Sequence, residues 1–168
     1  YLFLNIIAIV IIILVSIYIF TKRETFYNVT LNDEKFLYQC FPKNTMHSFR
    51  KYYPYANVNY YRNTDNDIEG MVFDTDNSII NETPNLTNNG LYISHLCVSK
   101  NKRGNGLGTK MMKDMEIKCK KLKKDHLVLL VKDSNLKAIN LYKSLGYIKQ
   151  QEGKLSDGST ACYYSKYI

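Results

Sequence analysis

A glycine-rich stretch at residues 98–110, VSKNKRGNGLGTK, could bind an anion. Three glycines alternate in it: Gly104, Gly106 and Gly108. Glycine reaches positive φ angles and lets a ligand approach the backbone closely. A helical pattern follows, and the first N–H groups of a helix are unsatisfied at the positive end of its dipole. The stretch therefore suits a pyrophosphate, and three side chains add mobile positive charge around it: Lys102, Arg103 and Lys110.

Two familiar phosphate-binding loops do not fit this stretch. A nucleotide P-loop ends in Gly-Lys-Ser/Thr, whereas Gly108 is followed here by Thr-Lys. The dinucleotide fingerprint G-x-G-x-x-G also fails, because Thr109 or Met111 stands where its third glycine belongs. The pattern that fits without gaps is Arg/Gln-x-x-Gly-x-Gly/Ala, matched by Arg103, Gly106 and Gly108.

A second motif, NLKAINLYKSLGY, occupies residues 135–147. It resembles the N-x-x-A-x-x-L-Y-x-x-x-G-F/Y pattern of the GCN5-related N-acetyltransferases, and it follows the glycine turn in the order and at the separation found in that family. On these motifs the chain is identified as a member of the family. The resemblance is good over residues 66–168 and loose over residues 24–65.

The resemblance implies an α/β fold with a mixed, mostly antiparallel central sheet. Helices flank this sheet, which is splayed in the middle (the acyl-CoA N-acyltransferase fold). It also implies acetyl-CoA as the cosubstrate and no metal. The pantetheine arm would lie between the splayed strands at residues 91–98 and 126–131, and the pyrophosphate would lie on the glycine turn. The implied cofactor-binding residues are Leu96, Cys97, Val98, Arg103, Gly104, Asn105, Gly106, Leu107, Gly108, Thr109 and Asn135.

Three residues are candidates for proton transfer. The resemblance implies that Tyr142 protonates the departing CoA thiolate, and a phenol with a pKa near 10 can do so. The acceptor amine must lose a proton before it attacks. His95 is one candidate base, with an ordinary pKa near 6.5, and Glu69 is a second. Ser94 could instead hold a water. Strand alternation places Ile93, His95 and Cys97 on one face of their strand.

The hydrophobic pattern predicts the elements that must position these residues. Residues 91–151 alternate strand, helix, strand, helix and strand, which favours a mixed α/β sheet. The predicted strands are 26–31, 58–62, 68–74, 91–98, 126–131, 147–151 and 161–167. The predicted helices are one or two short ones within 33–53, an amphipathic helix over 107–122, and 134–145 with a cap at Ser134 or Asn135.

Composition narrows the function classes. The 168 residues allow one globular domain, and the four cysteines form no CxxC pair, so we expect no paired-cysteine zinc site and four buried, unpaired thiols. Residues 99–154 carry 15 basic and 5 acidic side chains.

The expected activity is transfer of an acetyl group to a primary amine by direct attack in a ternary complex. The alternative is a non-catalytic acyl-CoA-binding module or a basic membrane-surface adaptor. Nucleic acid is not an expected partner.

Residues 1–20 are apolar and uncharged, long enough to span a bilayer as a helix. We expect a transmembrane helix there, a basic linker over 21–25 and the acetyltransferase domain over 26–168. Lys22 and Arg23 predict a single-pass protein with its domain in the cytoplasm. Three Asn-x-Thr sequons would accept glycans only in a lumenal domain, and we attribute them to chance: Asn28, Asn81 and Asn85.

Overall fold

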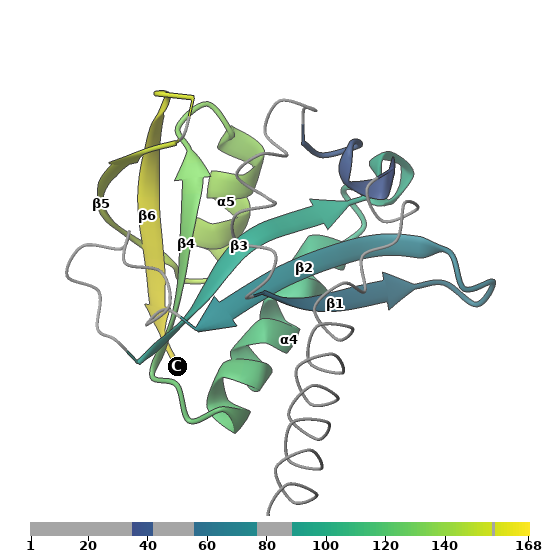
Figure 1. The fold of residues 1–168 in the computed structure, drawn as a ribbon, viewed down its shortest axis with the longest axis horizontal. Helices are drawn as coiled ribbons and strands as arrows, with labels where there is room; N and C mark the ends of the chain where they lie inside the picture. Colours follow the sequence, from purple (N-terminus) through teal and green to yellow (C-terminus); the bar gives the residue numbers. More distant parts are fainter. Residues whose placement is uncertain (1–34, 42–55, 77–88, 156) are drawn as a thin grey trace, which may run out of the picture. The chain divides into compact units, whose positions relative to one another are not determined.

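A computed structural model describes residues 35–41, 56–76, 89–155 and 157–168. Its centre is a six-stranded sheet in the order β1-β2-β3-β4-β6-β5 (Figure 1). All neighbouring strands are antiparallel except β3 and β4, so the predicted mixed sheet is confirmed. The strands are β1 (Asn57–Arg62), β2 (Ile68–Asp76), β3 (Gly90–Val98), β4 (His126–Lys132), β5 (Ile148–Lys154) and β6 (Thr160–Tyr167).

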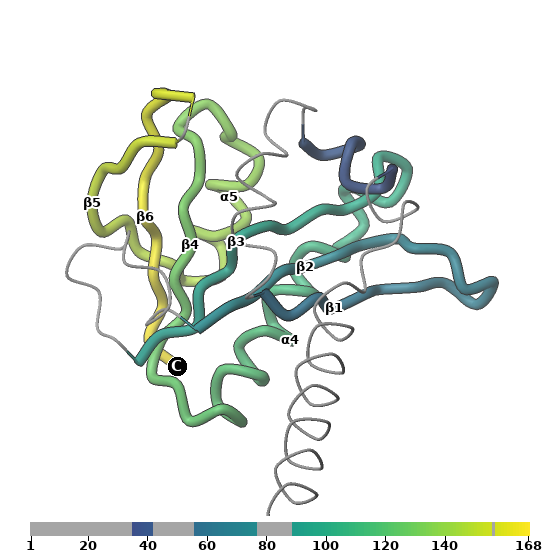
Figure 2. Tube along the Cα trace, in the orientation of Figure 1, coloured from purple at the N-terminus to yellow at the C-terminus, as the bar shows by residue number. Residues whose placement is uncertain are grey.

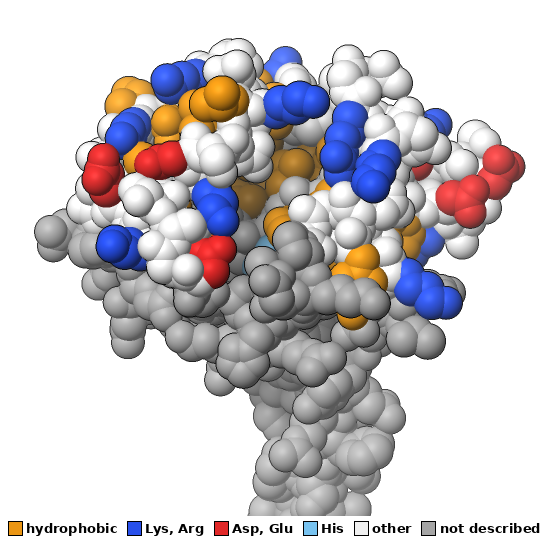
Figure 3. Space-filling view, turned by 90° about the horizontal axis from the view of Figure 1, so that it is seen from above, with side chains coloured by type: hydrophobic (Ala, Val, Ile, Leu, Met, Phe, Trp, Pro, Cys, Tyr) orange, Lys and Arg blue, Asp and Glu red, His pale blue; other side chains and the backbone are white. Residues whose placement is uncertain are grey.

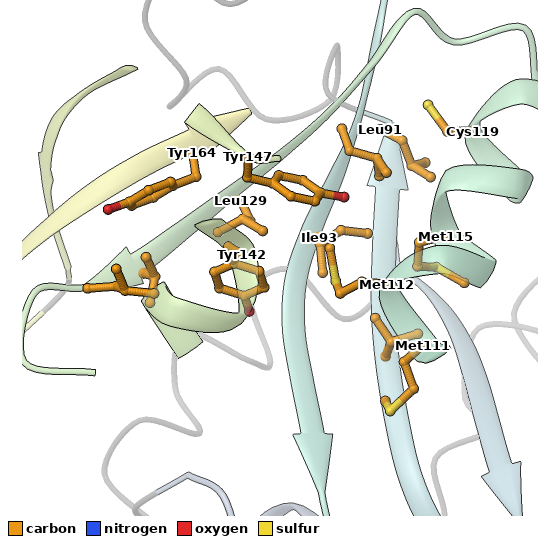
Figure 4. Close-up of a cluster of buried hydrophobic side chains, with 14 of the residues drawn as sticks. Leu91, Ile93, Met111, Met112, Met115, Cys119, Leu129, Tyr142, Tyr147 and Tyr164 are labelled. Atoms are coloured by element: carbon orange, nitrogen blue, oxygen red, sulfur yellow. The ribbon is translucent and has the colours of Figure 1, made fainter. Parts of the chain in front are cut away.

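Two helices cover one face of this sheet. They are α4 (Leu107–Lys121) and α5 (Leu136–Ser144), and a short 3-10 turn, η4 (Lys100–Lys102), precedes α4. The buried residues of α4 recur at helical spacing and face the sheet, as Figure 4 shows: Met111, Met112, Met115 and Cys119. The lysines between them face solvent or form ion pairs, so the amphipathic helix predicted from the sequence is confirmed.

The sheet opens in the middle. β3 pairs with β4 only from Gly90, opposite His126, to Ile93, opposite Leu129. Beyond this point β3 continues beside β2 and β4 continues beside β6, and the two strands diverge (Figure 2). The predicted splay is therefore present, between the two strands named from the sequence.

A β-bulge lies at the opening. Phe73 of β2 is opposite His95, but the next residue, Asp74, is opposite Ile93, so Ser94 is an extra residue in β3. The extra residue reverses the side-chain alternation. Ile93 belongs to the core beneath the helices, whereas His95 and Cys97 point to the opposite face. The prediction that all three share one face is wrong, because the simple period of two does not hold across a bulge.

Cys40 and Cys97 form a disulfide with their Cα atoms 5.6 Å apart. The prediction of four unpaired thiols is therefore wrong for this pair and right for Cys119 and Cys162, which are buried and free. The bonded cysteines are 57 residues apart in the sequence, so no local spacing indicates their pairing.

The other predicted elements mostly agree with the structure. The strands match within a few residues, and Asn135 caps α5 by accepting a hydrogen bond from the Ala138 amide at 3.3 Å. The strand at 26–31, the anchor at 1–20 and the linker at 21–25 lie outside the described residues, as does most of 33–53. Within the described ranges, no helix is long and apolar enough to cross a bilayer.

Candidate functional site

The glycine turn connects the end of β3 to the start of α4. Gly104 and Gly106 both have φ near +80°, and Gly106 is the N-cap residue of α4. A Cβ atom at either position would meet no described atom within 4 Å. Both glycines therefore combine a left-handed backbone with open space in front of it, and a ligand can approach the main chain closely.

Gly108 has a different role from the other two glycines. A Cβ there would lie 3.2 Å from Cδ2 of Leu141 in α5 and 4.0 Å from Cγ2 of Val98. Its missing side chain therefore lets α4 pack closely against α5 and β3. Gly104 and Gly106 thus leave space for a ligand, whereas Gly108 allows close helix packing.

The start of α4 is suited to an anion. The first helical hydrogen bond runs from the Lys110 amide to the Gly106 carbonyl at 2.9 Å, so the three preceding N–H groups have no partner within the helix: Leu107, Gly108 and Thr109. No side chain of the described residues caps this end. A cavity of about 400 Å³ lies in front of it, lined by Glu69, Lys102, Asn105, Gly106, Leu107 and Lys110. These amides, which have no partner within the helix, and the helix dipole favour a bound phosphate group.

The positive side chains of the turn are held by the protein. Lys102 forms an ion pair with Glu69 at 2.6 Å, and the Lys110 ammonium lies 5.4 Å from the centre of the Tyr61 ring. Arg103 donates from Nε to the Val98 carbonyl at 3.0 Å. The expectation of a mobile charge at Arg103 is therefore wrong, because its guanidinium is bound to backbone.

The opening of the sheet leads directly to this turn. From Ser94 to Val98, the side of β3 that faces β4 has no strand partner among the described residues. This stretch contains the three β3 positions predicted to bind cofactor: Leu96, Cys97 and Val98. The Cys97 side chain is committed to the disulfide, and Cys97 lies opposite Met71 in the β2–β3 pairing, so the backbone groups that face the opening are those of its neighbours Leu96 and Val98. In a view from above, hydrophobic side chains line a hollow between two groups of lysine and arginine residues (Figure 3).

Tyr142 lies beside the opening on the helix side of the sheet. The residue is 7% exposed and belongs to the hydrophobic core, with its ring 5.9 Å from that of Tyr147. Figure 4 shows its hydroxyl directed away from Tyr147 and Leu129. Burial raises the pKa of Tyr142 to about 12. The phenol therefore stays protonated at neutral pH and can act only as a proton donor there.

His95 lies on the opposite face of β3. Its ring makes edge contacts with Phe41 and Phe73, with centroid distances of 5.0 and 6.0 Å. Burial lowers the pKa of His95 to about 4, because the apolar surroundings disfavour the charged imidazolium. The imidazole is therefore neutral at physiological pH.

Acid should destabilise the fold through His95. Between pH 6.5 and pH 4 the unfolded chain binds a proton at this residue that the folded chain does not, so stability falls as the pH falls. We expect a loss of about 1–2 kcal/mol between pH 7 and pH 5. Urea unfolding of the full chain at both pH values measures it. His95→Phe keeps the ring contacts and should remove this loss, and an unchanged loss in the variant would contradict the assignment to His95.

Glu69 is separated from His95 along the sheet. Gly70 is opposite Val98, and Phe73 is opposite His95, so Glu69 lies about four residues, or roughly 13 Å, from the level of His95. Its carboxylate lines the cavity at the glycine turn and pairs with Lys102. The structure thus does not bring the two candidate bases together. In the parts of the chain that are described, no group of three His, Cys, Asp or Glu side chains could hold a metal.

Gln39 and Cys40 contact Arg103 of the glycine turn, and the sequence patterns did not predict this. Arg103 donates from Nη2 to the Gln39 carbonyl at 3.0 Å, and its Nη2 lies 3.3 Å from Cys40 Sγ. These partners are more than 60 residues away from Arg103 in the sequence. No local motif indicates such a contact.

Comparison with known proteins agrees with this geometry. The sequence pattern of the Acetyltransferase (GNAT) domain family matches residues 30–168. None of the curated proteins searched matches the chain. The chain is similar to many solved structures.

Three of these structures show the extent of the similarity. A Bacillus subtilis acetyltransferase in complex with CoA has a TM-score of 0.66 and 14% identity, over 84% of this chain and 94% of that one. A GNAT family acetyltransferase from Elizabethkingia anophelis with acetyl-CoA bound has a TM-score of 0.63 and 14% identity, with coverage of 84% and 94%. Ard1 from Thermoplasma volcanium has a TM-score of 0.52 and 20% identity, and the match spans 61% of this chain and 65% of Ard1. Identities this low show the fold that these proteins share.

Proposed function

The chain belongs to the acetyltransferase (GNAT) family, and we propose that it transfers the acetyl group of acetyl-CoA to a primary amine by direct attack in a ternary complex. One observation carries this proposal: beyond Ile93, the side of β3 that no described strand joins leads through η4 into the glycine turn. A long cofactor with amides at one end and a pyrophosphate at the other fits such a path.

Acetyl-CoA supplies an activated acetyl thioester. The N–H groups at the start of α4 would bind the pyrophosphate, because they are free of helical partners and lie at the positive end of the helix dipole. The main chain of β3 from Ser94 to Val98 would bind the pantetheine amides as a neighbouring strand does. The open space at Gly104 and Gly106 fits this arrangement.

Tyr142 is our candidate for the proton donor. The thiolate that leaves during transfer needs a proton, and a buried phenol with a pKa of about 12 holds one over the whole physiological range. Its hydroxyl points away from Tyr147 and Leu129 (Figure 4).

We assign proton removal from the acceptor amine to His95. Its imidazole is neutral at working pH and can accept a proton. A pKa of about 4 makes it too weak a base for a free ammonium group, so it would accept the proton only as the amine nitrogen attacks the thioester and becomes more acidic. Glu69, which is paired with Lys102, is assigned to holding the turn in place.

A turnover screen tests the proposal. The full chain in detergent micelles is incubated with acetyl-CoA and an amine panel of peptide N-termini, lysine peptides, polyamines and amino sugars, and CoA release is measured. We expect release with at least one class. Binding of acetyl-CoA without release for any amine would favour the non-catalytic module, and absence of binding would reject both.

We further propose that residues 1–20 anchor the protein and that Lys22 and Arg23 keep the domain in the cytoplasm. Protease added outside sealed endoplasmic-reticulum vesicles should then digest the domain, and the three sequons should stay unmodified. Protection from protease, together with a mass increase that a glycosidase removes, would reverse the orientation. A protein that salt washing or alkaline carbonate extracts from the membrane would contradict the anchor.

A further inference from the structure

The Cys40–Cys97 disulfide joins two parts of the chain beside the proposed cofactor site. Cys97 belongs to the part of β3 that no longer pairs with β4, one residue before Val98. Cys40 belongs to residues 35–41, which lie next to the end of β3 and the turn that follows it (Figure 2). The segment is anchored by Phe36 and Leu37, whose side chains are buried.

Arg103 joins these two parts to the glycine turn without a covalent bond. From the glycine turn it donates to the carbonyl of Val98 and to that of Gln39, both at 3.0 Å. Its Nη2 lies 3.3 Å from Cys40 Sγ, which itself lies 3.4 Å from the Val98 carbonyl oxygen. The disulfide and the guanidinium therefore meet at the point where β3 ends and the turn begins.

We propose that the Cys40–Cys97 disulfide positions the glycine turn for acetyl-CoA, so that its oxidation state sets the affinity for the cofactor. This inference rests on the proposed function. The disulfide fixes the residues that supply one carbonyl partner of Arg103, and Arg103 in turn fixes the first residues of the turn. A preorganised site binds more tightly because less conformational freedom is lost on binding.

Reduction would remove the covalent part of this arrangement. A dithiol reductant supplies two electrons and two protons, the S–S bond breaks, Cys40 and Cys97 become thiols, and the reductant becomes a disulfide. The remaining links to the segment include the Arg103 bond to Gln39 and a 3.4 Å contact from the Lys100 amide to Gln39 Oε1, and both are exposed to solvent. In a reducing compartment a disulfide is usually transient, catalytic or redox-sensing. A disulfide beside the cofactor site fits a redox-sensing role.

Titration of acetyl-CoA by calorimetry tests the inference, using the full chain oxidised and after treatment with dithiothreitol. We expect at least a fivefold loss of affinity on reduction. Cys40→Ser should show the weaker affinity and no response to the reductant. Cys119→Ser, which replaces a buried free thiol, should keep the response of the wild type. Thiol titration in denaturant should count two thiols in the oxidised wild type and four after reduction.

Different results overturn different statements. Equal affinity in both oxidation states, with a lower melting temperature after reduction, would make the disulfide a structural crosslink and overturn the inference alone. Four titratable thiols in air-oxidised protein would also overturn it. If Cys40→Ser does not fold, the affinities of the oxidised and reduced wild type, measured below the melting temperature, still test the inference. Failure of the oxidised wild type to bind acetyl-CoA would overturn the proposed function as well.

Discussion

Replacing Tyr142 by Phe should lower kcat by about 10²–10⁴-fold while the affinity for acetyl-CoA is retained. The ring keeps its place in the core beside Tyr147, so the fold should survive. The lost hydroxyl acts only when the thiolate departs, which confines the effect to the chemical step. Steady-state kinetics with an acceptor from the amine screen, together with calorimetry for acetyl-CoA, measures both quantities.

Two controls make this result specific. Tyr147→Phe removes the hydroxyl of a second buried tyrosine in the same cluster and should leave kcat nearly unchanged. Because the pKa of Tyr142 is about 12, the wild-type rate should show no decline from this group below about pH 11. Wild-type kcat in Tyr142→Phe, or an equal loss in Tyr147→Phe, would remove Tyr142 from the mechanism.

Gly106→Asp should weaken acetyl-CoA binding about 100-fold, which corresponds to about 2.8 kcal/mol. An Asp side chain must adopt the φ of +80° at this position and would place a carboxylate in the space proposed for the pyrophosphate. Strain and charge repulsion therefore act together. Calorimetric titration of the folded variant measures the loss.

Gly158 provides the matched control. It has a φ of +78° and open space around a Cβ atom, but it lies in the turn between β5 and β6. Gly158→Asp should therefore carry similar backbone strain and leave the affinity unchanged. Gly106→Ala separates strain from charge and should fall between the wild type and Gly106→Asp. Unchanged affinity in folded Gly106→Asp would exclude the turn as the pyrophosphate site.

The sequence predicted the features that depend on neighbouring residues. The apolar run of β3, the spacing of the methionines in α4 and the Asn135 cap each depend on a few successive positions, and the structure contains all three. Local patterns are reliable here because burial on one face and capping are decided within one or two turns of the chain.

The features that the sequence did not predict depend on contacts between distant residues. The bulge at Ser94 is visible only in the register of β2 against β3, yet it moves Ile93 to the other face. The partners of Cys97 and Arg103 lie in residues 35–41, where the family resemblance is loose. A one-residue insertion and a crosslink between distant segments leave no periodic signal.

The opening between β3 and β4 also affects solubility. Among the residues that the structure describes, it creates two strand edges inside the sheet, one on β3 after Ile93 and one on β4 after Leu129. An unpaired edge is a template for another chain, and proteins normally cover such edges to avoid aggregation. A cofactor lying along β3 would cover one edge and, by mass action, favour the protein that is not self-associated. The protein without acetyl-CoA should therefore self-associate more readily than the loaded protein, and the cell's supply of acetyl-CoA would help to keep it dispersed.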